Sequence, residues 1–136
     1  MSSGPVPSPT PETAPFWEST RAHAMRLPFC TACGRAHFYP RSQCPFCHAP
    51  DLEWREVSGR ATLASYVIDR RPAPVFETES QIVALVDLDE GPRMMTTIVE
   101  VEHDPAALHL GMPLTVRYTE RGDQVLPLFV PSGVDA

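Results

Sequence analysis

The sequence predicts a mainly β protein in which a short N-terminal helix leads into a rubredoxin-like zinc ribbon and then into a five-stranded OB-fold barrel. The cysteines form two Cys-x-x-Cys pairs, Cys30 with Cys33 and Cys44 with Cys47, and five segments after Gly59 alternate apolar and polar residues. The chain has 136 residues, 43% of them hydrophobic, which suffices for one compact unit with a minor attachment but not for two full domains.

The N-terminal part divides into two segments. Residues 1–15 contain five prolines among Ser, Thr and Gly, which predicts a disordered or extended leader. Residues 16–28 are expected to form an amphipathic helix that ends before Pro28. The residues that would share its apolar face are Phe16, Thr20, Ala24 and Leu27.

The cysteine segment, residues 29–56, has no long apolar period, so its order is expected to come from a bound metal ion. A tight turn lets both sulfurs of a Cys-x-x-Cys pair face one ion, and two such turns complete the tetrahedral shell that zinc accepts. Only ten residues separate Cys33 from Cys44, which predicts a minimal hairpin between the two turns.

The sequence leaves other roles for the four cysteines open. They could be free buried thiols, redox-active pairs, or the ligands of a single iron ion in a rubredoxin-like centre. His37 and His48 are interpreted as surface histidines, because four thiolates already fill the shell. A closed shell has no position for substrate, so the expected Zn²⁺ is structural.

Residues 57–131 are expected to form the barrel, followed by a tail at 132–136. A turn signal at 90–92 predicts a hairpin between the second and third strands, and Asp104-Pro105 predicts one helical turn before the fourth. Three strands, a small helix and two strands is the OB-fold order, with a small sandwich as the alternative. The expected strands are 61–69, 81–89, 94–101, 114–118 and 125–130.

The composition bears on partners and location. The net charge is -6, with 17 acidic residues against 11 arginines and no lysine, which argues against nonspecific binding to nucleic acid or anionic membranes. No segment has the length and apolarity of a membrane helix or the pattern of a signal peptide. A cytoplasmic location is therefore expected, where reduced thiols favour metal binding.

Several motifs together resemble a known family, the bacterial and archaeal zinc-ribbon plus OB-fold proteins that were first catalogued as a domain of unknown function. The resemblance spans about residues 16 to 131 and depends on the order of its motifs. One departure is His48, where many such turns have glycine. The matching motifs are Phe16-Trp17-Glu18, Cys30-Thr-Ala-Cys-Gly34, Tyr39-Pro40-Arg41, Cys44-Pro-Phe-Cys47, Gly59, Leu110-Gly-Met-Pro-Leu114 and Leu126-Pro-Leu-Phe129.

The resemblance implies an accessory subunit of acyl-CoA enzymes in lipid or steroid metabolism. Its expected partners are thiolases, thiolase-like lyases or aldolases, and hydratases with a hot-dog fold. In such hetero-oligomers the helix and ribbon pack on the enzyme, and the barrel helps to wall the channel that receives the acyl-CoA. Only the four cysteine ligands carry over residue by residue.

Two pairs of residues are candidate contacts. Phe16 and Trp17 are adjacent at the helix start, so one could insert into the domain while the other meets a partner, or both could pack within this chain. Arg70 and Arg71 follow the first barrel strand, where they could meet the phosphates of CoA or form a solvated turn.

No catalytic motif is apparent, because the cysteines are assigned to metal and no serine stands in a nucleophile motif. We therefore expect a protein that is not catalytic alone. The rival functions are a single-stranded nucleic-acid-binding module and an iron electron carrier. The segment 94–101 has no aromatic residue for stacking on bases, which disfavours the first rival.

Overall fold

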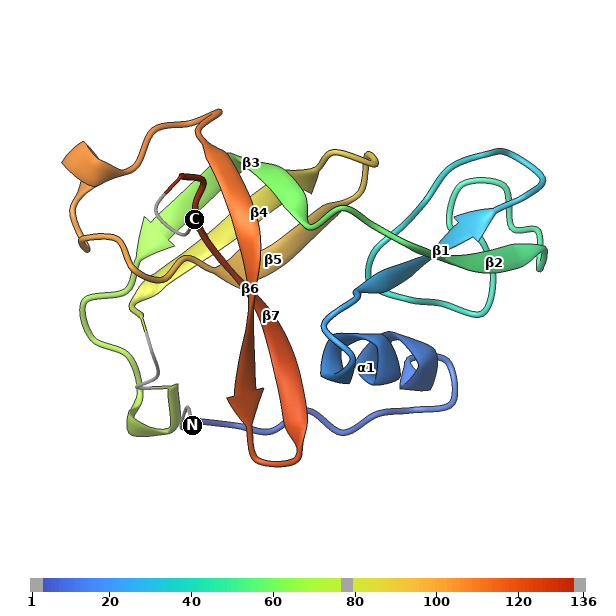
Figure 1. Ribbon diagram of the computed structural model, residues 1–136, viewed down its shortest axis with the longest axis horizontal. Helices are drawn as coiled ribbons and strands as arrows, with labels where there is room; N and C mark the ends of the chain where they lie inside the picture. Colours follow the sequence, from blue (N-terminus) through green and yellow to red (C-terminus); the bar gives the residue numbers. More distant parts are fainter. Residues whose placement is uncertain (1–3, 77–79, 134–136) are drawn as a thin grey trace.

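The computed structural model describes residues 4–76 and 80–133, and it has the mainly β architecture that the sequence predicts. Figure 1 shows a small ribbon at one end of the molecule, a barrel at the other, and one helix beside the connection between them. The helix α1 covers Ala14–Arg21, and the ribbon is a hairpin of β1, Arg26–Cys30, with β2, Leu52–Glu56.

The barrel strands follow the predicted order along the chain. The sheet order β5-β4-β3-β6-β7 is that of an OB-fold, in which the first strand lies at the centre and pairs with the second and the fourth. A 3₁₀ turn, Pro105–Ala107, precedes β6, and the Asp104 side chain caps it by accepting the Ala106 N–H at 2.9 Å, as expected. The strands are β3 Arg60–Ile68, β4 Ile82–Leu88, β5 Arg93–Thr97, β6 Pro113–Arg121 and β7 Gln124–Pro131.

The barrel is nearly closed between β5 and β7. Ile98 forms a parallel bridge with Phe129, and the Val99 N–H donates to the Phe129 carbonyl at 2.8 Å. The Thr96 hydroxyl donates to the Pro127 carbonyl at 2.9 Å. Side chains of alternate strand residues fill the interior, including Leu63, Val86 and Leu114, each at most 2% exposed.

The helix is shorter than the expected 16–28. It ends at Arg21 because His23 takes a left-handed conformation, with φ of 58°, which turns the chain away from the helix axis. Leu27 is buried as predicted, but it lies in β1, opposite Arg55 of β2. Leu27 fits the helical period by sequence spacing, whereas its burial comes from the ribbon hairpin.

The hairpin within the ribbon also differs from the expectation. Strands β1 and β2 flank both cysteine turns, and the segment between Cys33 and Cys44 does not pair with itself. Ala36 instead bridges to Phe29 of β1. The ribbon therefore gains its ladder from the strands that flank the cysteine turns, with Cys30 as the last residue of β1.

One glycine fixes the junction between ribbon and barrel. Gly59 has a φ of 80°, and a Cβ atom there would lie 2.5 Å from Cγ1 of Val116. Its carbonyl accepts the Val116 N–H at 2.8 Å. Only glycine allows the chain to enter β3 so close to β6.

The leader takes an extended course over its described residues. Cγ2 of Val6 lies 3.1 Å from where a Cβ would stand on Gly122, and Arg121 Nη1 donates to the Pro5 carbonyl at 3.5 Å. In Figure 1 this segment passes the β6–β7 turn before it reaches α1. Residues 1–3 of the expected leader and 134–136 of the expected tail lie outside the described residues.

Candidate metal centre and apolar groove

The four cysteines that the spacing predicts as ligands lie together at the end of the ribbon. Their Sγ atoms are all within 4.8 Å of one another. The Sγ atoms of Cys30 and Cys47 are 3.6 Å apart, as are those of Cys33 and Cys44. Tetrahedral coordination at a metal–sulfur distance of about 2.3 Å requires sulfurs about 3.8 Å apart, so the four thiols fit one ion.

The two cysteine turns have the same backbone design. The Gly34 N–H donates to the Cys30 carbonyl, and the His48 N–H donates to the Cys44 carbonyl, both at 2.8 Å. Gly34 and His48 are both left-handed, with φ of 79° and 66°. His48 therefore occupies a position that favours glycine, and its backbone is strained where glycine would not be. His48 is exposed, as the sequence predicts, but the prediction that His37 lies at the surface is wrong, since His37 is 3% exposed and its Nε2 accepts the Arg41 N–H at 3.3 Å.

Backbone amides point at the sulfurs. The Cys33 N–H approaches Sγ of Cys30, and the Phe46 N–H approaches Sγ of Cys44, each at 3.4 Å. Such hydrogen bonds favour the thiolate over the thiol and orient the ligand. The turns thus hold the cysteines ready for a cation.

The thiols influence one another's ionisation. Burial acts to raise the pKa of Cys44, but N–H groups of Cys47 and Phe46 and the neighbouring thiols outweigh it and lower that pKa to about 6. At Cys47 a hydrogen bond from the Ala49 backbone acts to lower the pKa, but burial and the thiols of Cys30 and Cys44 raise it to about 12. One sulfur ionises readily and its neighbour resists, because four thiolates cannot gather without a cation. A bound metal ion would supply that charge and close the shell.

Phe16 and Trp17 are both buried in this chain, with 1% and 7% of their surface exposed. Their rings meet edge to face at a centroid distance of 4.8 Å, and Phe16 also packs on Phe38 at 5.6 Å. The Trp17 indole N–H donates to the Tyr39 hydroxyl at 3.1 Å. In the isolated chain both aromatics dock the helix onto the ribbon and barrel.

Arg70 and Arg71 are exposed in the turn after β3. The Arg71 backbone N–H donates to the Asp69 carboxylate at 3.1 Å. Asp69 and Pro72, on either side of the pair, line a hollow of about 400 Å³ on the barrel surface. The structure does not bring either arginine to the metal centre.

This hollow continues into a second one. A hollow of about 290 Å³ lies at the seam between β5 and β7, and Trp17 and Tyr39 are among the residues that line it. Four residues line both hollows, so they form one groove, which we call the apolar groove. The shared residues are Val83, Thr97, Leu126 and Leu128.

The groove opens onto an exposed apolar face. Met95 of β5 is 65% exposed and Val83 of β4 is 39% exposed. Val67 of β3, 61% exposed, stands opposite Val83 in the strand register. Exposed apolar side chains that adjoin a groove mark a surface for a ligand or a partner. Sequence reasoning missed this surface, because its residues come from strands far apart in the chain.

A second feature that the sequence did not signal is a serine–histidine contact at one end of the groove. Ser80 Oγ lies 3.2 Å from Nε2 of His103 and accepts the Ile82 N–H at 3.1 Å. In the part of the chain that the structure describes, no carboxylate hydrogen-bonds the other ring nitrogen of His103. The contact therefore lacks the third group of a catalytic triad.

Two family models match consecutive parts of the chain. Residues 17–53 match the rubredoxin-like zinc ribbon domain of ChsH2, and residues 54–119 match its C-terminal OB-fold domain. This chain belongs to the ChsH2 family. The ribbon with its four gathered cysteines and the barrel described above correspond to these two domains.

Relatives of the ChsH2 family agree with this assignment. A protein of Thermomonospora curvata, described as a "probable enoyl-CoA hydratase alpha subunit", is 30% identical over 130 residues, which are 94% of this chain and 40% of the relative. The 3-oxo-4,17-pregnadiene-20-carboxyl-CoA hydratase alpha subunit of Mycobacterium tuberculosis is 30% identical over 125 residues, 92% of this chain and 39% of the relative. The chain spans about two fifths of the length of these two relatives.

A solved structure extends the likeness to three dimensions. A chain of the Ltp2-ChsH2(DUF35) aldolase superposes with a TM-score of 0.78 at 29% identity, covering 93% of this chain and 99% of that one. Among the described residues of this ChsH2-family chain, no helix has the length and apolarity to cross a membrane.

Proposed function

We propose that this chain is a non-catalytic accessory subunit that binds a thiolase-like enzyme, such as a thiolase or acyl-CoA lyase or aldolase, or a hydratase, and helps to form its acyl-CoA channel. The observation that carries the proposal is the apolar groove on the barrel, beside a ribbon whose four cysteines are gathered for a metal ion. A wall for an acyl chain needs such a surface, and it needs no reacting group of its own.

The chemistry of the groove suits an acyl chain. Leu126 and Leu128 line both of its hollows, and the hydroxyl of Thr96 donates a hydrogen bond to the Pro127 carbonyl. Within the described residues, no side chain that lines the groove has a buried donor or acceptor without a partner, so the apolar part of the groove favours an apolar ligand. The groove is therefore compatible with a bulky acyl group, such as the one in the carboxyl-CoA named for the mycobacterial relative. The other hollow is more polar, because Asp69, Ser80, Gln81 and Arg121 also line it.

The role of the metal in this proposal is structural. Zinc is the favoured ion because it accepts four thiolates in tetrahedral geometry and because the matching ribbon model is named for zinc. Four sulfurs leave no open coordination site. The residues that would hold the ion are Cys30, Cys33, Cys44 and Cys47.

The partner is inferred from relatives. Two of them are named as alpha subunits of hydratases, and a third is a chain of an aldolase described with two components. A subunit works with another polypeptide, and the exposed apolar face beside the groove gives this chain a surface for one. In this proposal the partner supplies the reacting groups, and Phe16 and Trp17 act on the interface indirectly, by holding the groove in shape.

A matched pair of variants tests the proposal. Met95→Glu places a charge on the groove, whereas Leu110→Glu places one on an equally exposed apolar residue away from it, since Leu110 is 69% exposed. Tagged chain co-expressed with a thiolase-like or hydratase-like enzyme should capture that enzyme as wild type and as Leu110→Glu, and lose it as Met95→Glu. Equal capture by all three chains would show that the groove is not part of the interface.

A further inference from the structure

The strand β5, Arg93–Thr97, lies at an edge of the barrel sheet. It pairs with β4 on one side, and on its other side no strand of the sheet adjoins it. Among the described residues, the bridge that closes the barrel lies past the end of β5, between Ile98 and Phe129 of β7. Beside the strand itself, the seam is spanned by a side chain, since the Thr96 hydroxyl donates to the Pro127 carbonyl.

Pro127 explains why the seam stays open beside β5. Proline has no N–H, so β7 cannot donate a ladder hydrogen bond to β5 from this position. The edge of β7 is further covered by α1, which packs against that strand. The edge of β5 contains no proline and can serve as a template for another strand.

The register shows which backbone groups of β5 face the seam. Hydrogen-bonded and non-hydrogen-bonded pairs alternate along an antiparallel ladder. The Leu88 N–H of β4 donates to the Pro92 carbonyl, which fixes this alternation. By the same register the N–H of Thr96 faces β4. The N–H and C=O groups of Arg93 and Met95 therefore point into the seam.

Two further observations agree with this orientation. Val99 has the same place in the alternation as Met95, and its N–H does point across the seam, where it donates to the Phe129 carbonyl. The backbone groups of Met95 have no hydrogen-bond partner across the seam among the described residues, and its side chain is exposed. The edge is thus both unpaired and accessible.

The apolar groove runs along this edge. Residues 94–97 of β5 line its hollow of about 290 Å³ on one side, and residues 126–128 of β7 line the other. Proteins bind extended peptides in grooves of this kind by strand addition, in which backbone hydrogen bonds provide affinity and alternate side chains enter the groove.

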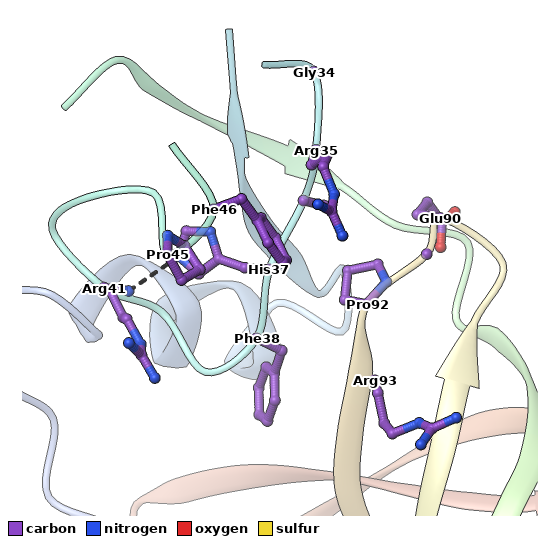
Figure 2. Close-up of a pocket in the computed structure, with 12 residues that line it drawn as sticks. Gly34, Arg35, His37, Phe38, Arg41, Pro45, Phe46, Glu90, Pro92 and Arg93 are labelled. Carbon is purple, nitrogen blue, oxygen red and sulfur yellow. Dashed lines mark hydrogen bonds between the residues drawn. The ribbon is translucent and has the colours of Figure 1, made fainter. Parts of the chain in front are cut away.

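Arginines gather where β5 begins. Beyond Arg93 lies a second hollow, between the ribbon and the β4–β5 turn, and Phe38 lines both this hollow and the groove. Figure 2 shows Arg35 and Arg41 on the ribbon side of the second hollow. Its one acidic lining residue is Glu90, and Arg35 and Arg41 make no ion pair within the described residues. A segment that extends from the groove into this hollow is expected to carry negative charge there.

We propose that an extended segment of the partner enzyme adds to the outer edge of β5 as a further strand, with apolar side chains at alternate positions and an acidic residue at the end beside Arg93. Its backbone bonds to Arg93 and Met95, its inward side chains enter the apolar groove, and its carboxylate pairs with Arg35 or Arg41. This inference rests on the proposed function and deepens it, because the segment would be one wall of the acyl-CoA channel and the groove the other.

A second copy of this chain fits the edge less well. Two β5 strands that paired antiparallel about Met95 would place Thr97 of one copy opposite Arg93 of the other, with no carboxylate for the arginines. Each copy would also bring a net charge of -6. The isolated chain is therefore expected to sediment as a monomer, and a dimer with a protected Met95 amide would overturn the assignment to a partner enzyme.

Amide hydrogen exchange tests the strand pairing in the complex with a co-expressed thiolase-like or hydratase-like enzyme. In the isolated, metal-loaded chain the Thr96 amide should be protected by β4, and the Met95 amide should exchange freely. Binding of the enzyme should slow exchange at Met95 by about tenfold or more, with a smaller change at Thr96. An unchanged Met95 amide in a complex that does form would overturn this inference and leave the accessory role standing. Failure of the complex to form would overturn both.

Variants separate backbone pairing from side-chain contact. Met95→Pro removes an N–H that points away from β4, so it should lower the affinity for the enzyme about tenfold or more. Met95→Leu keeps the N–H and an apolar side chain, and it should restore binding. Thermal unfolding shows whether Met95→Pro folds, and the exchange measurement does not depend on that variant. Equal binding by folded Met95→Pro and Met95→Leu would overturn the strand pairing.

A second pair of variants tests the charged end of the segment. Arg41→Ala should weaken binding of the enzyme and make it less dependent on salt. Arg55→Ala should change neither, because Arg55 lies on β2, pairs with Glu53 and does not line the second hollow. If Arg41→Ala binds as wild type at every salt concentration, the segment has no acidic end at this hollow and that part of the proposal is wrong.

Discussion

The indole N–H of Trp17 donates to the hydroxyl of Tyr39 at 3.1 Å, which joins the helix to the ribbon loop across 22 residues of chain. The other side of the helix is tied to the barrel, where Arg21 Nη1 donates to Oε1 of Gln124 at 2.8 Å. Since Trp17 and Tyr39 also line the apolar groove, the helix sets the shape of the surface proposed to meet a partner.

Replacing Trp17 tests this arrangement. Trp17→Ala should destabilise the chain by about 3 kcal/mol, as expected for loss of a buried aromatic, and should weaken capture of the partner enzyme because the groove loses one wall. The metal content should not change, because the four cysteines are held by their own turns. Denaturant titration, metal analysis and co-purification measure the three effects. If the variant captures the enzyme at wild-type strength, the helix does not contribute to the interface.

Tyr39→Phe is the milder companion. It removes the hydrogen bond from Trp17 and keeps the ring, so the expected loss is about 1 kcal/mol with capture largely preserved.

The left-handed residues of the two cysteine turns predict opposite effects of two substitutions. His48→Gly should stabilise the metal-loaded chain by up to about 1 kcal/mol, because glycine adopts a φ of 66° without strain. Gly34→Ala should destabilise the metal-loaded chain by about 1 kcal/mol, because alanine is strained at a φ of 79°. The added Cβ would meet no heavy atom within 4 Å, so steric overlap does not contribute to this loss. Thermal unfolding at fixed zinc concentration compares them. Changes of the same sign would mean that backbone strain is not what distinguishes the two turns.

Tyr118 predicts an alkaline loss of stability. Its hydroxyl accepts the Met25 N–H at 2.8 Å, and burial raises its pKa, a shift that the hydrogen bond from Met25 opposes and the nearby Glu56 reinforces. The folded chain therefore favours the neutral phenol. The resulting stability is present in full below the unfolded pKa of about 10 and declines as the pH rises from there towards the folded pKa.

Tyr118→Phe provides the comparison. The variant should be about 1 kcal/mol less stable at pH 8, because the Met25 N–H loses its partner. That difference should shrink above about pH 10, where only the wild-type chain has a phenol to ionise. Unfolding curves measured from pH 8 to pH 11 would show it, and a gap that widens with pH would contradict the assigned shift.

Metal removal should affect the ribbon first. A chelator is expected to abolish amide protection in the ribbon, while the barrel strands, whose core is built from their own side chains, lose protection later. The colour of the purified protein distinguishes the ions, since a four-sulfur iron site is red and zinc is colourless. A chain that keeps a fully protected ribbon without metal would refute the structural role of the ion.

The sequence predicted the features that short-range patterns determine. The spacing of the cysteine pairs identified four thiols that do gather, and the period of two located all five barrel strands. Asp104 was recognised as a cap because the capping contact lies within two residues.

The features that it did not predict depend on contacts far apart in the chain. Leu27 fitted a helical period although it belongs to β1, because only the pairing with β2 decides between the two. The apolar groove joins Val83 to Leu126, and a hollow between the ribbon and the β4–β5 turn joins His37 to Glu90. The roles of Arg70 and Arg71 stay a prediction.

The most direct test of the accessory role is a turnover assay with acyl-CoA on the co-purified enzyme alone, on this chain alone, and on the two together. We expect no turnover by this chain alone and faster turnover by the pair than by the enzyme alone. Turnover of the thioester by the isolated chain, or an enzyme equally active with and without it, would contradict the account.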